Sequence, residues 1–275
     1  MKIDLQVHTF LERYSLEDVI NAMKRNNVDI ASLMKYNEDY YQEILTASKK
    51  LPYNYRVEED GLLIKIENVL TRDKRFFIRG VEVKTNDRFH LVVIGYKGIP
   101  RNRTTKETIE DALEADAFVY IDHPYVDCDS LEKDITKEQE ECLDSLCHFY
   151  SGKIALEWSA YCKPGLRKFL CGIDVNEKAI LLSQKLEKKG ISIPVVADTD
   201  LHGRYIFLLD AMGTAHIETD VDVSSGSKFV KSLRENVFNR RYRNCYNNKY
   251  GYVSIFHFTF ALGFPYIFNL DRNRG

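Results

Sequence analysis

The feature that most constrains the fold is an alternation of short apolar runs with longer amphipathic segments. The apolar runs are rich in β-branched and aromatic residues, which favour strands. An alternation of this kind is typical of βα units and argues against an all-helical or an all-β protein. The runs expected to form strands are residues 2–7, 30–34, 61–70, 76–83, 91–96, 117–122, 153–158 and 193–197.

The segments between these runs carry helix start and stop signals. Ser15 precedes apolar residues at the spacing i, i+3, i+4 and i+7, so it can cap an amphipathic helix. Thr104 and Thr136 each stand three residues before a Glu or a Gln, which is the spacing of a capping box. Gly190 is placed to end a fourth helix that begins near Asn176. We therefore expect helices in these four segments.

Residues 61–83 break the alternation, because two strand-like runs flank the polar residues 71–75 with no helix between them. We expect a β-hairpin there. A chain of 275 residues without internal repeats or a Pro/Ser-rich linker can form one large domain. We expect this domain to cover residues 1–245 and an aromatic tail, residues 246–275, to pack on it.

Composition limits the cellular setting and the partners. The 39 basic and 41 acidic residues leave a formal charge of -2, so no overall field attracts nucleic acid or a membrane. The apolar stretch 252–270 is long enough for a membrane span, but a polar residue, His257, and a Gly-Phe-Pro break favour buried strands. The six cysteines form no CxxC pair, and residues 1–4 open no signal peptide. We expect a cytoplasmic protein with reduced cysteines and no membrane contact, and the oligomeric state stays open.

Potential metal ligands stand at or near the ends of the expected strands. They are His8, Glu82, His90, His123, Asp200 and His202. In barrels of βα units the loops that follow the strands converge, so residues distant in sequence meet there. Imidazole and carboxylate suit zinc, manganese or iron. The remaining histidines, His148, His216 and His257, lie elsewhere and are given no role.

The order of these motifs resembles that of the polymerase and histidinol phosphatase (PHP) family. Residues 4–9, Asp-Leu-Gln-Val-His-Thr, resemble the family's opening Asp-Leu-His-x-His-Thr motif. The resemblance extends over residues 1 to about 240. Five further segments are similar to motifs of the family, in the same order: the Gly-x-Glu strand (80–83), the strand after it (89–96), the His-Pro motif (123–124), a strand carrying a glutamate (155–158) and the closing Ser-Asp-x-His-Gly (197–203).

The resemblance implies a distorted (β/α)7 TIM-like barrel of the PHP type, in which two or three divalent metal ions (Zn, Mn or Fe) serve the hydrolysis of phosphoric esters. By position, one ion would be held by His8, Glu82 and Asp200, and a second by Glu82, His90 and His123. Glu82 would bridge the two ions.

Three further residues are given roles around this centre. His202 would contribute to a third ion or orient the phosphate, and as an imidazole it could protonate the leaving oxygen. Arg204 could bind a phosphate as a fork donor, or it could be a solvated loop residue. Lys35 could pair with a substrate phosphate.

The sequence departs from the family pattern at two places. Gln6 replaces the first histidine of the opening motif, and its amide oxygen is a poorer ligand for a transition metal. It still shares a strand face with His8. Lys35 and Tyr36 stand where the family has an acid and a histidine. These changes count against a third ion and leave two expected.

Two functions are compatible with a reduced site. In the first, two ions hydrolyse a phosphomonoester, a nucleotide or an oligonucleotide, and Lys35 supplies a charge that an ion would otherwise supply. In the second, the barrel is catalytically degenerate and acts as a binding or scaffold module. The number of retained ligand positions favours the first. The basic run 240–243, with tyrosines interleaved, is either a contact to a nucleic-acid backbone or a solvated face.

Overall fold

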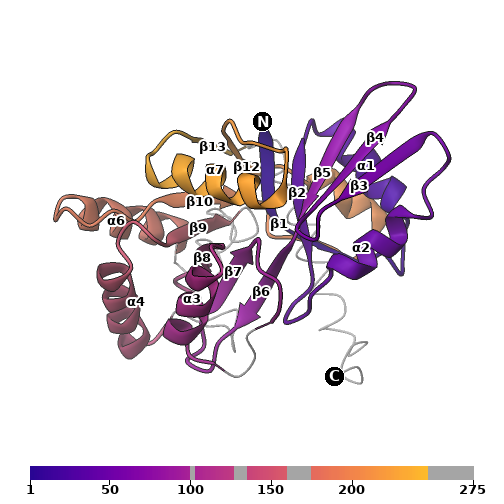
Figure 1. The fold of residues 1–275 in the computed structure, drawn as a ribbon. Coiled ribbons are helices and arrows are strands. Elements are labelled where there is room, and N and C mark those ends of the chain that lie inside the picture. Colours follow the sequence, from indigo (N-terminus) through magenta and orange to yellow (C-terminus); the bar gives the residue numbers. More distant parts are fainter. Residues whose placement is uncertain (100–102, 127–134, 160–174, 247–275) are drawn as a thin grey trace, which may run out of the picture.

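The computed structural model describes residues 1–99, 103–126, 135–159 and 175–246, and its strands form two sheets flanked by helices (Figure 1). The larger sheet contains β1 (Lys2–Thr9), β2 (Ile30–Met34), β3 (Tyr55–Glu59), β4 (Leu63–Asn68), β5 (Lys74–Ile78), β11 (Leu201–Gly203), β12 (Ala215–Glu218) and β13 (Arg243–Tyr246). Its order is β13-β12-β1-β2-β5-β4-β3, with β11 paired to β1. The smaller sheet contains β6 (Gly80–Lys84), β7 (His90–Ile94), β8 (Phe118–Asp122), β9 (Ala155–Ser159) and β10 (Val195–Asp198), in the order β10-β9-β8-β7-β6.

The helices begin where their capping residues predict. Ser15, Thr104 and Thr136 each accept a hydrogen bond from the backbone of the third helical residue, and each capping box is complete. Gly190 adopts a left-handed backbone (φ +78°) just after the fourth predicted helix. The described helices are α1 (Leu16–Arg25), α2 (Tyr41–Ser48), α3 (Thr105–Glu114), α4 (Lys137–Phe149), α6 (Val175–Glu187) and α7 (Gly226–Phe238), with a 3-10 helix η1 (Ile206–Ala211). None of the helices among the described residues is both long and apolar enough to cross a membrane.

The expected hairpin is confirmed, because β4 and β5 pair antiparallel. The expected strand 76–83 is divided, however, since β5 belongs to the larger sheet and β6 to the smaller one. Between them the amide of Arg79 donates to Leu62 O (2.8 Å), and its carbonyl accepts from Gly95 N (2.8 Å). A Cβ at Gly80 would lie 2.2 Å from Ser32 Oγ, so only glycine allows this close approach.

The α/β class is confirmed, but strand and helix do not alternate throughout as a (β/α)7 barrel requires. Between α2 and α3 the chain forms five consecutive strands. The two sheets meet along two seams. At one, Tyr36 forms an isolated bridge with Glu82, and Asn37 N donates to Glu82 O (2.9 Å). At the other, the amide of Asn244 donates to Val195 O (2.7 Å). Within the described residues these sparse contacts replace continuous strand pairing.

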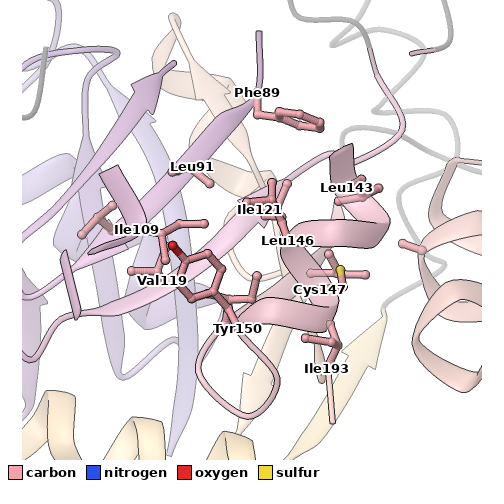
Figure 2. Packing of buried hydrophobic residues seen from close by; sticks show 14 of the residues in the cluster. Phe89, Leu91, Ile109, Val119, Ile121, Leu143, Leu146, Cys147, Tyr150 and Ile193 are labelled. Atoms are coloured by element: carbon pink, nitrogen blue, oxygen red, sulfur yellow. The ribbon is translucent and has the colours of Figure 1, made fainter. Parts of the chain in front are cut away.

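The smaller sheet has an apolar layer on each face. On its outer face, β7 and β8 pack with Leu91, Val119 and Ile121 against α3 and α4 (Figure 2). On its inner face, Phe118 and Tyr120 of β8 join a second cluster that also includes residues of β1, β2 and α7. Because side chains alternate along a strand, Asp122 shares the inner face with these two rings. The sheet therefore directs the acid at the end of β8 toward the interior.

The aromatic tail, residues 246–275, falls almost wholly outside the described residues, as do His257 and the apolar stretch 252–270. Of the basic run, Tyr242 donates to Val195 O (2.6 Å) and Arg243 pairs with Glu218. These two residues therefore have partners within the fold.

Candidate metal centre

Glu82 lies between two histidines at the seam of the two sheets. Its Oε2 is 2.8 Å from His8 Nε2, and its Oε1 is 2.6 Å from His90 Nδ1. Burial alone would raise the pKa of Glu82, but the hydrogen bonds to His8 and His90 hold that pKa well below its usual value. Glu82 is therefore a carboxylate with one oxygen directed at each imidazole.

One group of potential ligands surrounds His90. Glu82, His90, Asp122 and His123 each place one donor atom within 4.8 Å of all the others. His123 Nε2 is 3.2 Å from Asp122 Oδ2, and Tyr36 Oη is 3.0 Å from His90 Nε2. All four members of the group are buried. The backbone at His123 has a positive φ of 28°, a strained geometry that turns this side chain beside Asp122 instead of to the opposite face.

A second group surrounds Asp200. His8, Asp200 and His202 again place donor atoms within 4.8 Å of one another. His8 Nε2 is 3.6 Å from Asp200 Oδ1, and the rings of His8 and His202 stack with centroids 4.6 Å apart. The side chain of His202 is 36% exposed, whereas those of His8 and Asp200 are buried. His202 therefore marks the side of the centre that faces solvent.

Buried acids connect the group around His90 with the group around Asp200. Asp122, Glu157 and Asp200 form a third cluster of atoms within 4.8 Å. Burial, followed by the charge of Asp122, raises the pKa of both Glu157 and Asp200 well above the usual range. Burial also raises the pKa of Asp198, which accepts a hydrogen bond from Tyr120 Oη (2.6 Å). Within the described residues no lysine or arginine forms an ion pair with any of these four acids.

Gln6 places its amide nitrogen at the centre of the acids. Its Nε2 lies 3.0 Å from Asp122 Oδ2, 3.1 Å from Asp200 Oδ1 and 3.4 Å from Glu82 Oε2. Its Oε1 is buried and has no partner among the described residues. The neutral amide thus directs its two N–H donors at a cluster of three carboxylates, at the position where the resemblance expects a histidine ligand, and it adds no positive charge there.

The residues expected to bind phosphate are placed differently from one another. Lys35 Nζ lies 3.2 Å from Glu43 Oε2 and 4.6 Å from the centre of the Tyr40 ring. Arg204 directly follows β11, and its backbone amide donates to His202 O (2.9 Å). The backbone of Arg204 is therefore next to the exposed histidine of the centre, whereas Lys35 is paired with Glu43.

Asp122, Glu157 and Asp198 were given no role from the sequence, although each lies in or beside a motif of the resemblance. Asp122 precedes His123, Glu157 is inside a strand, and Asp198 is two residues before Asp200. Their common signal is an acid at or near the end of an apolar strand, where the chain would bury it. Asp4, also fully buried, accepts from Thr199 and Gly213.

The donors that converge here fit divalent cations. Imidazole nitrogen and carboxylate oxygen are the ligands of zinc, manganese and iron. One oxygen each of Asp122, Glu157 and Asp198 is buried and accepts no hydrogen bond from the described residues, so these oxygens are available to a cation. Burial and, after it, repulsion among the acids raise the pKa values of Glu157 and Asp200, and a bound cation would relieve the repulsion.

Two solved structures are similar to this chain in fold. One is the lesion-specific endonuclease PfuEndoQ from Pyrococcus furiosus, 16% identical, with a TM-score of 0.52 over 86% of this chain and 56% of that one. The other is a two-domain protein from Bacteroides vulgatus that contains a predicted PHP-like metal-dependent phosphoesterase, 15% identical, with a TM-score of 0.53 over 90% of this chain and 65% of that one. The chain thus spans less than two thirds of either protein, and at these identities the likeness shows the fold alone. No family model and no curated protein sequence matches the chain.

Proposed function

We propose that this chain is a divalent-metal-dependent phosphoesterase whose two sheets are the halves of a distorted barrel of the PHP type. The observation that carries the proposal is the buried group of histidines and carboxylates at the seam, in which the acids have no lysine or arginine as counter-ion among the described residues. Buried charges require a partner or a proton, and several acids placed side by side favour a multivalent cation. The likeness in fold to the two-domain protein from Bacteroides vulgatus, which contains a predicted PHP-like metal-dependent phosphoesterase, supports the same activity.

Two ions are proposed to share Glu82. The first would be held by His8, Glu82 and Asp200, and the second by Glu82, His90, Asp122 and His123. The divided contacts of Glu82, with one oxygen on each histidine, support the bridging role. Glu157 and Asp198 would add negative charge beneath the ions. Zinc, manganese and iron all accept this donor set.

When bound, such ions would polarise the phosphoryl group and lower the pKa of a water molecule. The chain's own residues would do the rest. His202, which is partly exposed and stacked on His8, would protonate the leaving oxygen. Arg204 beside it would bind a non-reacting phosphoryl oxygen. Tyr36 Oη, 3.0 Å from His90 Nε2, would fix the orientation of that ring. Lys35, paired with Glu43, would have to leave this partner to reach a phosphate.

A nucleotide or an oligonucleotide is the substrate class that we favour over a phosphorylated metabolite. Tyr205 and Phe207 follow Arg204, and their rings lie parallel (4° between planes) with centroids 5.7 Å apart. The rings are 39% and 52% exposed. Exposed aromatic rings next to a phosphate-binding residue suit the stacking of a nucleobase. The likeness in fold to an endonuclease supports the same class.

The alternative, a degenerate binding or scaffold module, is favoured by one observation. The amide nitrogen of Gln6 lies within hydrogen-bonding distance of three carboxylates and supplies donors, not a ligand, at that position. To serve an ion, the amide would have to turn its unpartnered Oε1 toward the acids.

A hydrolysis assay separates the two functions. Purified protein is supplied with Zn²⁺, Mn²⁺ or Fe²⁺ and given a phosphomonoester, nucleotides and single-stranded and duplex oligonucleotides. We expect turnover with at least one ion, loss of that turnover in His123→Ala, and retention in His148→Ala, whose histidine is exposed on α4 and belongs to no ligand group of the centre. Rates for the unaltered protein no higher than those for His123→Ala would support the scaffold module.

A further inference from the structure

A separate group of potential ligands lies on the edge of the larger sheet. His216 and Glu218 are on β12, and Cys245 is on β13. The two strands pair antiparallel with His216 directly opposite Cys245, so these side chains project from the same face of the sheet. Glu218, two residues beyond His216, shares that face. One donor atom from each of the three residues lies within 4.8 Å of the other two.

His216 has the orientation of a metal ligand. Its side chain is buried, with the residue 6% exposed. Its Nδ1 lies 3.0 Å from Gly213 O, and because a carbonyl only accepts, this contact assigns the ring hydrogen to Nδ1. Nε2 then carries a lone pair. It has no hydrogen-bond partner among the described residues and lies 3.5 Å from Glu218 Oε1. Ligating histidines typically donate their second ring nitrogen to a backbone carbonyl in this way.

The other two residues supply complementary donors. Glu218 Oε2 accepts from Arg243 Nε (3.1 Å), which keeps the carboxylate ionised and leaves Oε1 facing His216. Cys245 is a free, half-buried thiol whose Sγ makes a weak contact, 4.0 Å, with Arg243 O. Lys2, opposite Glu218 on β1, donates a hydrogen bond from its ammonium to Asn26 O (2.8 Å) and interacts electrostatically with both Glu218 and Cys245.

We propose that His216, Glu218 and Cys245 form a second metal site that binds one zinc-like ion and fastens β13 to β12. The site is independent of the proposed phosphoesterase centre. A tetrahedral zinc with a thiolate ligand requires ligand atoms about 3.3 to 3.7 Å apart. His216 Nε2 and Glu218 Oε1 already have this separation, and the distances to Cys245 have to shorten by no more than about 1.5 Å. Rotation of the half-exposed Glu218 and Cys245 side chains can supply this. Binding replaces the S–H bond of Cys245 with a sulfur–metal bond and releases the proton to solvent.

Cobalt tests this site without interference from the other centre. Co²⁺ bound by a thiolate gives a sulfur-to-metal charge-transfer band in the near ultraviolet, and the histidine–carboxylate centre has no cysteine among its described ligands. We expect the band to saturate when about one equivalent of Co²⁺ is bound at the thiolate site. We expect it to disappear when Zn²⁺ is added.

Matched variants assign the band to its residues. We expect Cys245→Ser and His216→Gln to lose it. Cys142→Ser, which alters another half-buried thiol on α4, and His123→Ala, which alters the other centre, should keep it. Circular dichroism checks that each variant is folded. A band that is missing in the unaltered protein, or that persists in Cys245→Ser, would overturn the proposal, and neither result would bear on hydrolysis.

Discussion

Asp4 offers a quantitative test of the buried acids, because its pKa is displaced to a stated value. Burial raises the pKa of this fully buried carboxyl to about 6 from an ordinary 3.8, despite hydrogen bonds from Thr199 and Gly213. A raised pKa in the folded state means that ionisation favours unfolding. The destabilisation is absent below the unfolded-state pKa and complete above the folded-state pKa.

The size of the effect follows from the displacement of that pKa. A shift of about 2 units corresponds to about 3 kcal/mol, and about 2 kcal/mol of this develops between pH 4.5 and pH 8. The variant Asp4→Asn keeps the shape of the side chain and cannot ionise. We therefore expect the free energy of unfolding of the unaltered protein, relative to Asp4→Asn, to fall by about 2 kcal/mol over that range of pH.

Urea denaturation in the presence of a chelator measures this difference, since bound metal would mask it. Asp116→Asn, at an exposed position, is the matched control and should give a difference that does not fall with pH. A difference between the unaltered protein and Asp4→Asn that stays constant, or that grows as the pH rises, would refute the assignment of a raised pKa to Asp4.

Three further predictions follow from the centre and the core. Restoring a ligand with Gln6→His should raise the bound metal and the hydrolysis rate together, and elemental analysis with the same assay would detect a failure of either. Replacing Tyr205 or Phe207 by Ala should raise KM for nucleotides by roughly 5- to 150-fold, as expected for about 1 to 3 kcal/mol of stacking, and leave KM for a phosphomonoester without a base unchanged. Leu143 is fully buried between α4 and the smaller sheet, so Leu143→Ala should lower the free energy of unfolding, measured by urea denaturation, by about 2 to 5 kcal/mol. Leu181 is exposed, so Leu181→Ala should change that free energy by less than about 0.5 kcal/mol.

Local features of the fold could be predicted from the sequence, because they depend on neighbouring residues. The capping boxes at Ser15, Thr104 and Thr136 are satisfied within three residues, and the helices begin there. The division of residues 76–83 between two sheets was not predictable in the same way. Its cause is the hydrogen bonding of the Arg79 backbone to Leu62 and Gly95. Nothing in the apolar sequence of residues 76–83 indicates that the strand changes from one sheet to the other at this point.

The candidate site shows the same contrast. The histidines and Glu82 could be predicted to converge, because strand ends meet in α/β folds. The roles of Asp122 and Glu157 could not, since neither the end of β8 nor the middle of β9 marks an acid as part of a site, and only burial brings these two carboxyl groups into interaction. The pairing of His216 with Cys245 depends on the register of strands far apart in the sequence, which no local pattern fixes.

Dependence of hydrolysis on bound metal can be measured by titration. Metal-stripped Cys245→Ser protein, which lacks the thiol of the second site, is titrated with the most activating of Zn²⁺, Mn²⁺ and Fe²⁺ while oligonucleotide or nucleotide hydrolysis is measured. We predict that the rate rises from background to a plateau when about two equivalents of ion are bound per chain. The same titration of protein that also carries His123→Ala should remain at background. A rate that does not depend on metal, or that is the same with and without His123, would contradict the account.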